Sequence, residues 1–206
     1  DADTGSERVV SVRDFLIGAA ACEMPPSWKE NALLAQMAAS HSYALALGEP
    51  MQVNAALCAG WTDSDVLKAR WGDDFDANYA RFAALADKVA GALLCYHGAP
   101  AAACYHSISS GVTETSQNVW TSALPYLQGV ASPWDKTADG YETTITYSLE
   151  QVDAILQNLG LTADPLADTA PAAWFGAAQW DEAGYVAEMT VCGERFSGTR
   201  LRRALA

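Results

Sequence analysis

The stretch SVRDFLIGAAACEMPPSWKE, residues 11–30, predicts that one helix ends and a second begins. Ser11 is a typical N-cap with Asp14 placed to return its hydrogen bond, and the apolar residues that follow recur at helical spacing. Pro25-Pro26 should end this helix, because a proline disfavours helical geometry in the residue before it. Ser27 and Glu30 have the spacing of a second capping box, which predicts that another helix starts here.

Helical spacing continues through the first half of the chain. The second helix should stop near Gly48, and it is expected to bury the face formed by Leu34, Met37, Ala38, His41 and Leu45. Further helices are expected from about Asp63 to Gly72 and from about Phe75 to Ala90. We expect His41 to be a hydrogen-bonded core residue, which is a more common role than that of ligand for a histidine on an inner helix face.

Strand-like patterns begin at residue 92. In chain order, we expect strands at Ala92–Tyr96, Ala101–His106 and Tyr141–Tyr147, a helix capped by Ser148 and closed by Gly160, a surface loop at Leu161–Pro171, a hairpin of Trp174–Trp180 with Tyr185–Cys192, and a final helix capped by Ser197. This order predicts an α+β fold, in which a helical N-terminal part is followed by β-hairpins with a further helix. Residues 1–206 are expected to form a single compact domain, or two lobes, 1–91 and 92–206, around a cleft.

Composition excludes several classes of protein. The formal net charge is −13, from 25 acidic and 12 basic residues, and such a field repels phosphate backbones, so we expect no nucleic-acid partner. No apolar run approaches the length of a membrane span. The five cysteines are an odd number without a CxxC pair, which indicates neither a disulfide scaffold nor a zinc ribbon.

Glu23 is the first candidate for chemistry. It lies where the first helix must stop, and a carboxylate at a helix C-terminus faces the negative end of the helix dipole, which favours its protonated form. Apolar neighbours such as Met24 and Phe15 act in the same direction. A general acid near neutral pH needs these conditions. An ordinary exposed helix-end glutamate has the same pattern, and on spacing alone it is the more common outcome.

A dense polar run, HSISSGVTE at residues 106–114, is the second candidate. Its hydroxyl and carboxyl groups match the hydroxyls of a saccharide, although a solvated turn that bonds its own backbone has the same composition. A Ser-His-acid triad lacks a nucleophile-elbow pattern here. Cys95, His97, Cys104 and His106 could in principle hold zinc. Seven tryptophans in this length are compatible with sugar stacking, but most tryptophans are core residues.

Taken in order, these pieces resemble one known family. The opening of the stage II sporulation protein D family is similar to FLIGAAACEMP at 15–25, ALLAQ at 32–36 and SYAL at 42–45. Its middle is similar to Trp71-Gly72, Asn78-Tyr79, LLCYHG at 93–98 and YHSISSGVTE at 105–114. The resemblance continues through NVW at 118–120, YL at 126–127, VASPWD at 130–135, Gly193, Ser197-Gly198 and Leu201-Arg202.

The resemblance implies a lytic transglycosylase that cleaves peptidoglycan during engulfment in sporulation, anchored to the membrane on its extracytoplasmic side through an anchor absent from this chain. It implies that glycan strands are the substrate and that an amidase of the stage II sporulation protein P type is a partner. The family's catalytic glutamate maps onto Glu23. The implied substrate-binding residues are Gln36, Tyr43, His106, Ser107, Ser109, Thr113 and Glu114. No cofactor is expected, although some members of the family bind zinc.

The chain departs from the family pattern at three residues. Cys22 replaces the usual glycine before the glutamate, Ser110 replaces a glycine of the polar run, and His41 stands where arginine is common. The chain also stops at Ala206, before a Gly-His-Gly-Val-Gly-Met-like segment of the family, so we expect that segment to be absent. The alternative function is that of a non-catalytic, wall-binding enhancer of a cell-wall amidase.

Overall fold

The computed structural model describes residues 1–2, 4–48, 50–54, 60–120, 122–161 and 173–205, which form two compact units, Asp1–Tyr105 and His106–Ala206. The boundary follows residue 105 and not residue 91, where the helical pattern ends, because the hairpin after residue 91 packs against the second helix of the first unit. Both units combine helices with antiparallel strands, which confirms the predicted α+β class. None of the helices in the described residues combines the length and apolarity that a bilayer crossing requires.

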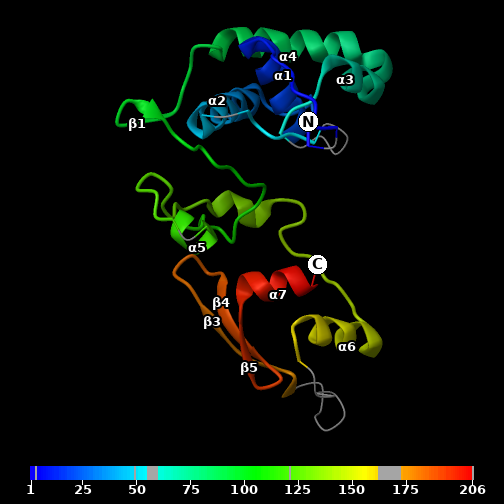
Figure 1. Ribbon diagram of the computed structural model, residues 1–206, viewed down its shortest axis with the longest axis vertical. Coiled ribbons are helices and arrows are strands. Elements are labelled where there is room, and N and C mark those ends of the chain that lie inside the picture. The colour runs from blue at the N-terminus through cyan, green and yellow to red at the C-terminus, as the bar shows by residue number, and fades with distance from the viewer. Residues whose placement is uncertain (3, 49, 55–59, 121, 162–172, 206) are drawn as a thin grey trace. The chain divides into compact units, whose positions relative to one another are not determined.

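The first unit is built on helices α1 (Val12–Glu23), α2 (Glu30–Leu47), α3 (Ser64–Trp71) and α4 (Phe75–Val89), with a 3-10 turn, η1 (Gly72–Asp74), before α4. Helices α1, α2 and α4 pack against one another around an apolar core (Figure 1). The largest fully buried side chains of this core are Leu16, Ile17, Leu33, Met37, Leu67 and Phe82. The predicted cap of α1 is confirmed, because Ser11 accepts a hydrogen bond from the backbone N–H of Asp14, and Asp63 caps α3 in the same way.

Helix α1 also makes one backbone contact that fixes its position. A Cβ atom added at Gly18 would lie 2.1 Å from the backbone oxygen of Thr62 and 2.4 Å from the indole nitrogen of Trp61. The indole nitrogen of Trp61 donates to the backbone oxygen of Asp14 at 3.1 Å. The segment at 61–62 therefore lies directly on the helix backbone, at a distance that only glycine permits.

Helix α2 differs from the expectation at its start and on its buried face. Lys29 occupies the N-cap without a side-chain hydrogen bond, so the predicted capping box is wrong; the Glu30 carboxylate instead pairs with Lys88 of α4 at 2.5 Å. The helix ends at Gly48 in the left-handed conformation, as predicted. Its buried residues are Leu33, Gln36, Met37, Ser40, His41 and Ser42, whereas Leu45 is 48% exposed. Polar side chains thus form much of the buried face.

The hairpin of the first unit is shorter than predicted. Strand β1 is Cys95–Tyr96 and strand β2 is Ala99–Pro100, paired antiparallel. His97 and Gly98 both have positive φ, 49° and 82°, as a two-residue hairpin turn requires. The predicted strand Ala92–Tyr96 is therefore too long, because only Cys95–Tyr96 pair. The predicted strand Ala101–His106 is wrong, because the chain beyond Pro100 leaves the ladder.

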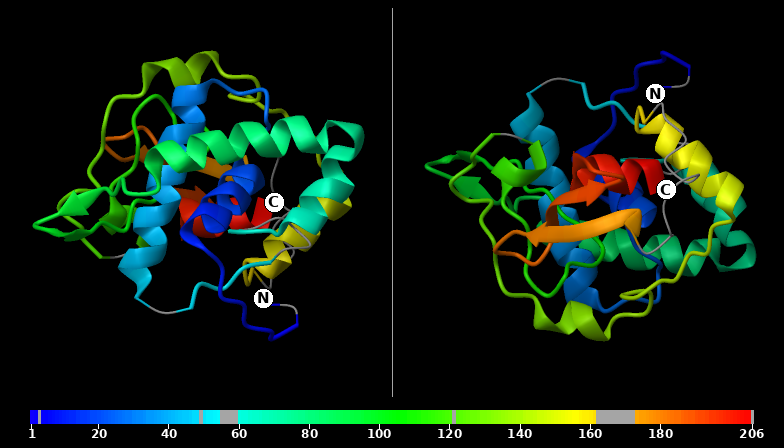
Figure 2. Two further views of the ribbon diagram at one scale, coloured as in Figure 1. Left: turned by 90° about the horizontal axis from the view of Figure 1, so that it is seen from above. Right: turned by 90° about the horizontal axis from the view of Figure 1, so that it is seen from below.

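The second unit contains a three-stranded antiparallel sheet of β3 (Phe175–Trp180), β4 (Val186–Val191) and β5 (Glu194–Ser197). Helix α7 (Gly198–Leu205) lies against β4 and β5 (Figure 2) and contacts α6 (Leu149–Asn158). Leu156, Leu159, Val191, Phe196 and Leu201 form the core. Helix α5 (Ser116–Trp120) and the 3-10 helix η2 (Pro133–Thr137) precede these elements.

Several predictions for the second unit are confirmed. Ser148 caps α6 in a capping box with Gln151, Ser197 accepts from the backbone N–H of Arg200 at 3.3 Å, and β3 and β4 form the predicted hairpin. The predicted strand at Tyr141–Tyr147 is wrong, because this segment enters no ladder and Ile145 is 62% exposed. Strand β5 was not predicted. The predicted loop at Leu161–Pro171 lies outside the described residues after Leu161.

Candidate functional site

Glu23 is the last residue of α1, and local sequence explains why the helix stops there. Met24 turns to an extended conformation ahead of Pro25, while its N–H still donates to the backbone oxygen of Ala20. The preceding residues Leu16, Ile17 and Ala20 are buried in the core, whereas Glu23 is exposed. A helix whose central residues are buried in the core therefore presents one carboxylate at its solvent-exposed end.

Tyr105 is the partner of this carboxylate. Its phenolic hydroxyl donates to Oε1 of Glu23 at 3.1 Å, although the two residues are separated by 82 positions in the chain. Loss of solvent around the hydroxyl, followed by the negative charge of Glu23 and the hydrogen bond to it, raises the pKa of Tyr105 to about 12. The hydroxyl therefore keeps its proton at any physiological pH and acts only as a donor to Glu23.

Two neutral side chains of α2 complete the cluster. Gln36 and Ser40 lie one helical turn apart, each 5% exposed, and Nε2 of Gln36 donates to Oγ of Ser40 at 3.1 Å. Both side chains hydrogen-bond the Tyr105 hydroxyl and partly oppose the rise of its pKa. Gln36, which the sequence analysis assigned to substrate binding, thus reaches the Glu23 cluster through Tyr105.

The turn that follows Glu23 is held by α4. Arg81 donates to the backbone oxygens of Pro26 and Trp28, each at 2.7 Å. Trp28 itself is 49% exposed. Because these two bonds fix the carbonyls of the turn, the chain that leaves Glu23 has little freedom to move the carboxylate.

The segment that leads to Tyr105 is tied to α2 by two buried residues. Ser42 is 0% exposed and accepts from the backbone N–H of Leu94 at 2.8 Å. His41 is buried, as predicted, and the backbone of Ala92 hydrogen-bonds its ring. Burial lowers the pKa of His41, and that hydrogen bond partly opposes the shift. Its Nδ1 atom has no partner among the described residues.

The polar run 106–114 belongs to the second unit, where Asp135 organises it. Ser109 donates to Oδ2 of Asp135 from both its hydroxyl, at 2.6 Å, and its backbone N–H, at 2.9 Å. Nε2 of His106 lies 3.7 Å from the same oxygen. The Ser109 hydroxyl, followed by its N–H, lowers the pKa of Asp135. Ser109 and His106 both contact the Asp135 carboxylate and do not contact each other, whereas a catalytic triad requires a hydrogen bond between serine and histidine.

The rest of the run is held by its backbone. Tyr185 donates to the backbone oxygen of Val112, and its hydroxyl accepts from the N–H of Ser110 at 3.1 Å. Oγ of Ser110, the residue in place of a family glycine, donates to the backbone oxygen of Ala183 at 2.5 Å. At Glu114, Oε1 accepts from Thr115 and Asn118, while Oε2 is buried without a partner among the described residues.

The predicted site residues divide between the two units. Gln36 and Tyr43 lie on α2 of the first unit, where Tyr43 is half-buried. In the second unit, His106 and Ser107 are exposed, Thr113 and Glu114 are half-buried, and Ser109 is only 3% exposed with its hydroxyl bound to Asp135. Sequence reasoning missed Tyr105 and Ser40; the position of Tyr105 directly before His106 was the available signal.

The cysteine and histidine pattern considered for zinc does not form a donor set. Cys95 is exposed and pairs across the hairpin with Pro100, so Cys104 lies beyond the paired strands. Across the described ranges, no group of three or more His, Cys, Asp or Glu side chains is arranged to hold a metal ion.

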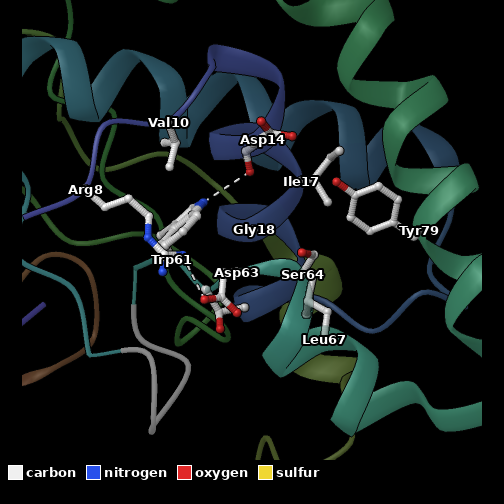
Figure 3. A pocket seen from close by; sticks show the side chains of 11 residues that line it. Arg8, Val10, Asp14, Ile17, Gly18, Trp61, Asp63, Ser64, Leu67 and Tyr79 are labelled. Atoms are coloured by element: carbon white, nitrogen blue, oxygen red, sulfur yellow. Dashed lines mark hydrogen bonds and ion pairs between the residues drawn. The ribbon is translucent and has the colours of Figure 1, made fainter.

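A pocket of about 160 Å³ lies elsewhere in the first unit. Figure 3 shows the Trp61 indole between Arg8 and α1, with its nitrogen directed to the backbone oxygen of Asp14. Arg8 pairs with Asp63, and the distance between Nη1 and Oδ2 is 2.8 Å. The pocket lies along residues 14–18 of α1, and neither Glu23 nor another predicted site residue lines it. It is a feature separate from the Glu23 cluster.

Comparison with known proteins identifies the family. The family model described as "Stage II sporulation protein" matches residues 2–121, more than half of the chain. The chain belongs to the stage II sporulation protein family. It is 30% identical over 168 residues to Stage II sporulation protein D of Bacillus subtilis (strain 168), a match that covers 75% of this chain and 47% of that protein.

Two further relatives extend the comparison of this stage II sporulation family member. The chain is 32% identical over 165 residues to Stage II sporulation protein D of Bacillus amyloliquefaciens, with 74% of this chain and 46% of that protein covered. It is 29% identical over 158 residues to the Amidase enhancer of Bacillus subtilis (strain 168), with 76% of this chain and 19% of that protein covered. The chain thus spans about half the length of the curated sporulation proteins that it matches.

Proposed function

We propose that this protein is a peptidoglycan lytic transglycosylase with Glu23 as its catalytic acid and base. The observation that carries this proposal is the Glu23 carboxylate itself, exposed at the end of a buried helix and hydrogen-bonded by a tyrosine that keeps its proton. A side chain that must give and then take a proton needs access to substrate and a fixed position, and Glu23 has both. Membership of the stage II sporulation protein family supports a role in sporulation.

The chemistry requires one carboxyl group. Glu23 donates its proton to the oxygen of the β-1,4 bond between N-acetylmuramic acid and N-acetylglucosamine, and that bond breaks. The carboxylate then removes the proton of the muramoyl 6-hydroxyl, whose oxygen closes the 1,6-anhydro ring on the anomeric carbon. Glu23 ends the cycle protonated, and no water is consumed. The paired carboxylates of a glycoside hydrolase are therefore unnecessary, and the reaction needs no cofactor.

The substrate and the setting follow from the same proposal. Glycan strands, preferably without stem peptides, occupy the site, and Gln36, Tyr43, His106, Ser107, Ser109, Thr113 and Glu114 remain the predicted binding residues. For Ser109 the structure favours an indirect role, because its hydroxyl already binds Asp135. An amidase of the stage II sporulation protein P type is the expected partner, on the extracytoplasmic side of the membrane during engulfment.

A second function is carried by a different observation. The relative named Amidase enhancer is nearly as similar to this chain as the sporulation proteins, at 29% identity over 158 residues. A non-catalytic module of this kind would bind cell wall and stimulate a separate amidase. It would need no acid at residue 23, so the two functions differ in what they require of Glu23.

One experiment separates the two functions. Glycan strands stripped of stem peptides are incubated with wild type, with Glu23→Gln and with Glu7→Gln, an exposed glutamate of the same unit as control. We expect wild type and Glu7→Gln to release products with 1,6-anhydro-muramoyl ends, and Glu23→Gln to lose at least about 100-fold in rate. Equal inactivity of all three, together with stimulation of a purified amidase, would support the enhancer function instead.

A further inference from the structure

The hydrogen bonds around Tyr105 run in one direction. The amide nitrogen of Gln36 can only donate, and it donates to Oγ of Ser40. The Ser40 hydrogen is then available to the Tyr105 oxygen, which both α2 side chains address. The last hydrogen in this series of hydrogen bonds, that of the Tyr105 hydroxyl, is directed to Oε1 of Glu23.

This direction makes the two oxygens of Glu23 unequal. Oε1 accepts the Tyr105 hydrogen whether the carboxyl group is protonated or ionised, because a carbonyl oxygen and a carboxylate oxygen are both acceptors. The proton of the neutral carboxyl group is therefore excluded from Oε1, which already faces a donor. We propose that Tyr105 is a positioning residue that occupies Oε1 of Glu23, so that Oε2 alone carries the proton to and from the substrate.

The inference rests on the proposed function and deepens it. The same atom, Oε2, gives its proton to the glycosidic oxygen and then takes the proton of the 6-hydroxyl, so the side chain need not rotate between the two steps. Tyr105 does not exchange its own proton. Its high pKa, about 12, excludes it as the acid, and Glu23 is the charged group acting on its hydroxyl, while Ser40 and Gln36 are neutral donors.

The test compares Tyr105→Phe with wild type and with Tyr79→Phe, a half-buried tyrosine of α4 packed against the same core. The carboxyl carbon of Glu23 is followed by ¹³C NMR as a function of pH. Because the Tyr105 hydroxyl donates to the ionised carboxylate, losing this donor should move the titration midpoint of Glu23 to higher pH in Tyr105→Phe and leave it unchanged in Tyr79→Phe. An identical midpoint in all three proteins would overturn the inference.

Kinetics on stripped glycan strands provide the second readout. Tyr105→Phe should lose about 10- to 100-fold in kcat with KM nearly unchanged, and the alkaline limb of its pH–activity profile should move to higher pH, as the NMR midpoint does. A merely structural role would lower activity without moving that limb. If wild type releases no 1,6-anhydro products, the proposed function is wrong. If it releases them but Tyr105→Phe changes neither the NMR midpoint of Glu23 nor the alkaline limb of the pH–activity profile, only the proposed role of Tyr105 is wrong.

A thermodynamic cycle isolates the path through Tyr105. Ser40→Ala should raise the NMR midpoint of Glu23 by a smaller amount than Tyr105→Phe, because it weakens the Tyr105 donor without removing it. In a protein that already carries Tyr105→Phe, adding Ser40→Ala should leave the midpoint where it is. A shift of equal size in both backgrounds would show that Ser40 acts on Glu23 by another route and would contradict the proposed arrangement.

Discussion

The hydroxyl of Ser42 accepts a hydrogen bond from the backbone N–H of Leu94 at 2.8 Å. The Ser42 hydroxyl also donates to the backbone oxygen of Ala38, one turn earlier in α2, so it acts as both donor and acceptor within the first unit. The chain between the end of α4 and Tyr105 is thereby attached to the helix that carries Gln36 and Ser40. The position of Tyr105 beside Glu23 depends on this attachment.

We expect Ser42→Ala to destabilise the protein by about 1–3 kcal/mol, since the Leu94 N–H loses its acceptor at a partly buried position. Urea denaturation measures the change. Ser27→Ala, at an exposed serine, should cost less than about 0.5 kcal/mol. Equal stability of the two variants would contradict a structural role for the Ser42–Leu94 bond.

His41 should make stability depend on pH. Because burial lowers its pKa in the folded state below the usual value of about 6.5, the unfolded chain binds the proton more readily. The contribution of neutral His41 is therefore complete above about pH 6.5 and is lost as pH falls through that value towards its folded pKa. His41→Gln should flatten the fall in unfolding free energy between about pH 8 and about pH 5, whereas His97→Gln, at an exposed histidine, should not.

Asp135 should hold the polar run of the second unit. Asp135→Asn weakens the acceptor for the hydroxyl and N–H of Ser109, so we expect faster amide hydrogen exchange at Ser109 and Gly111 than in wild type. Asp139→Asn, at an exposed aspartate, should leave exchange there unchanged. Because the pKa of Asp135 is lowered in the fold, this protection is complete above about pH 3.8 and is lost as pH falls through the folded pKa.

A methyl group at residue 18 should disrupt the first unit. The Cβ of Gly18→Ala would lie 2.1 Å from a backbone oxygen, which cannot move as the end of a flexible side chain can, so we expect a loss of at least about 3 kcal/mol or failure to fold. Gly91→Ala is the matched control, because a Cβ there meets nothing within 4 Å. Similar denaturation curves for the two variants would show that the 61–62 segment can move away from α1.

Sequence patterns predicted the features that depend on neighbours along the chain. The caps at Ser11 and Ser148 and the helix stop at Gly48 involve contacts within a few residues, and all are confirmed. The strand expected at Tyr141–Tyr147 was wrong because strand propensity alone does not supply a ladder partner.

The candidate site was only partly predictable for the same reason. Glu23 could be identified from its helix stop and from the family resemblance, but its partner Tyr105 is 82 residues away, and no local pattern indicates such a contact. Gln36 and Ser40 are also buried, although the apolar pattern of α2 predicted a buried face that shares only Met37 and His41 with the observed one. Burial of polar side chains on a helix therefore marked the site better than hydrophobic spacing did.

The close approach at Gly18 also determines how precisely the Glu23 carboxylate is placed. Glu23 is the fifth residue after Gly18. A helix slipped by one residue would turn its side chains by about 100° and advance by about 1.5 Å. Because there is no room for a methyl group at Gly18, the 61–62 segment fixes the rotation of α1 about its axis and its position along that axis before any substrate binds. The position of the Glu23 carboxylate is thus determined by a backbone contact about one and a half helical turns earlier in the chain.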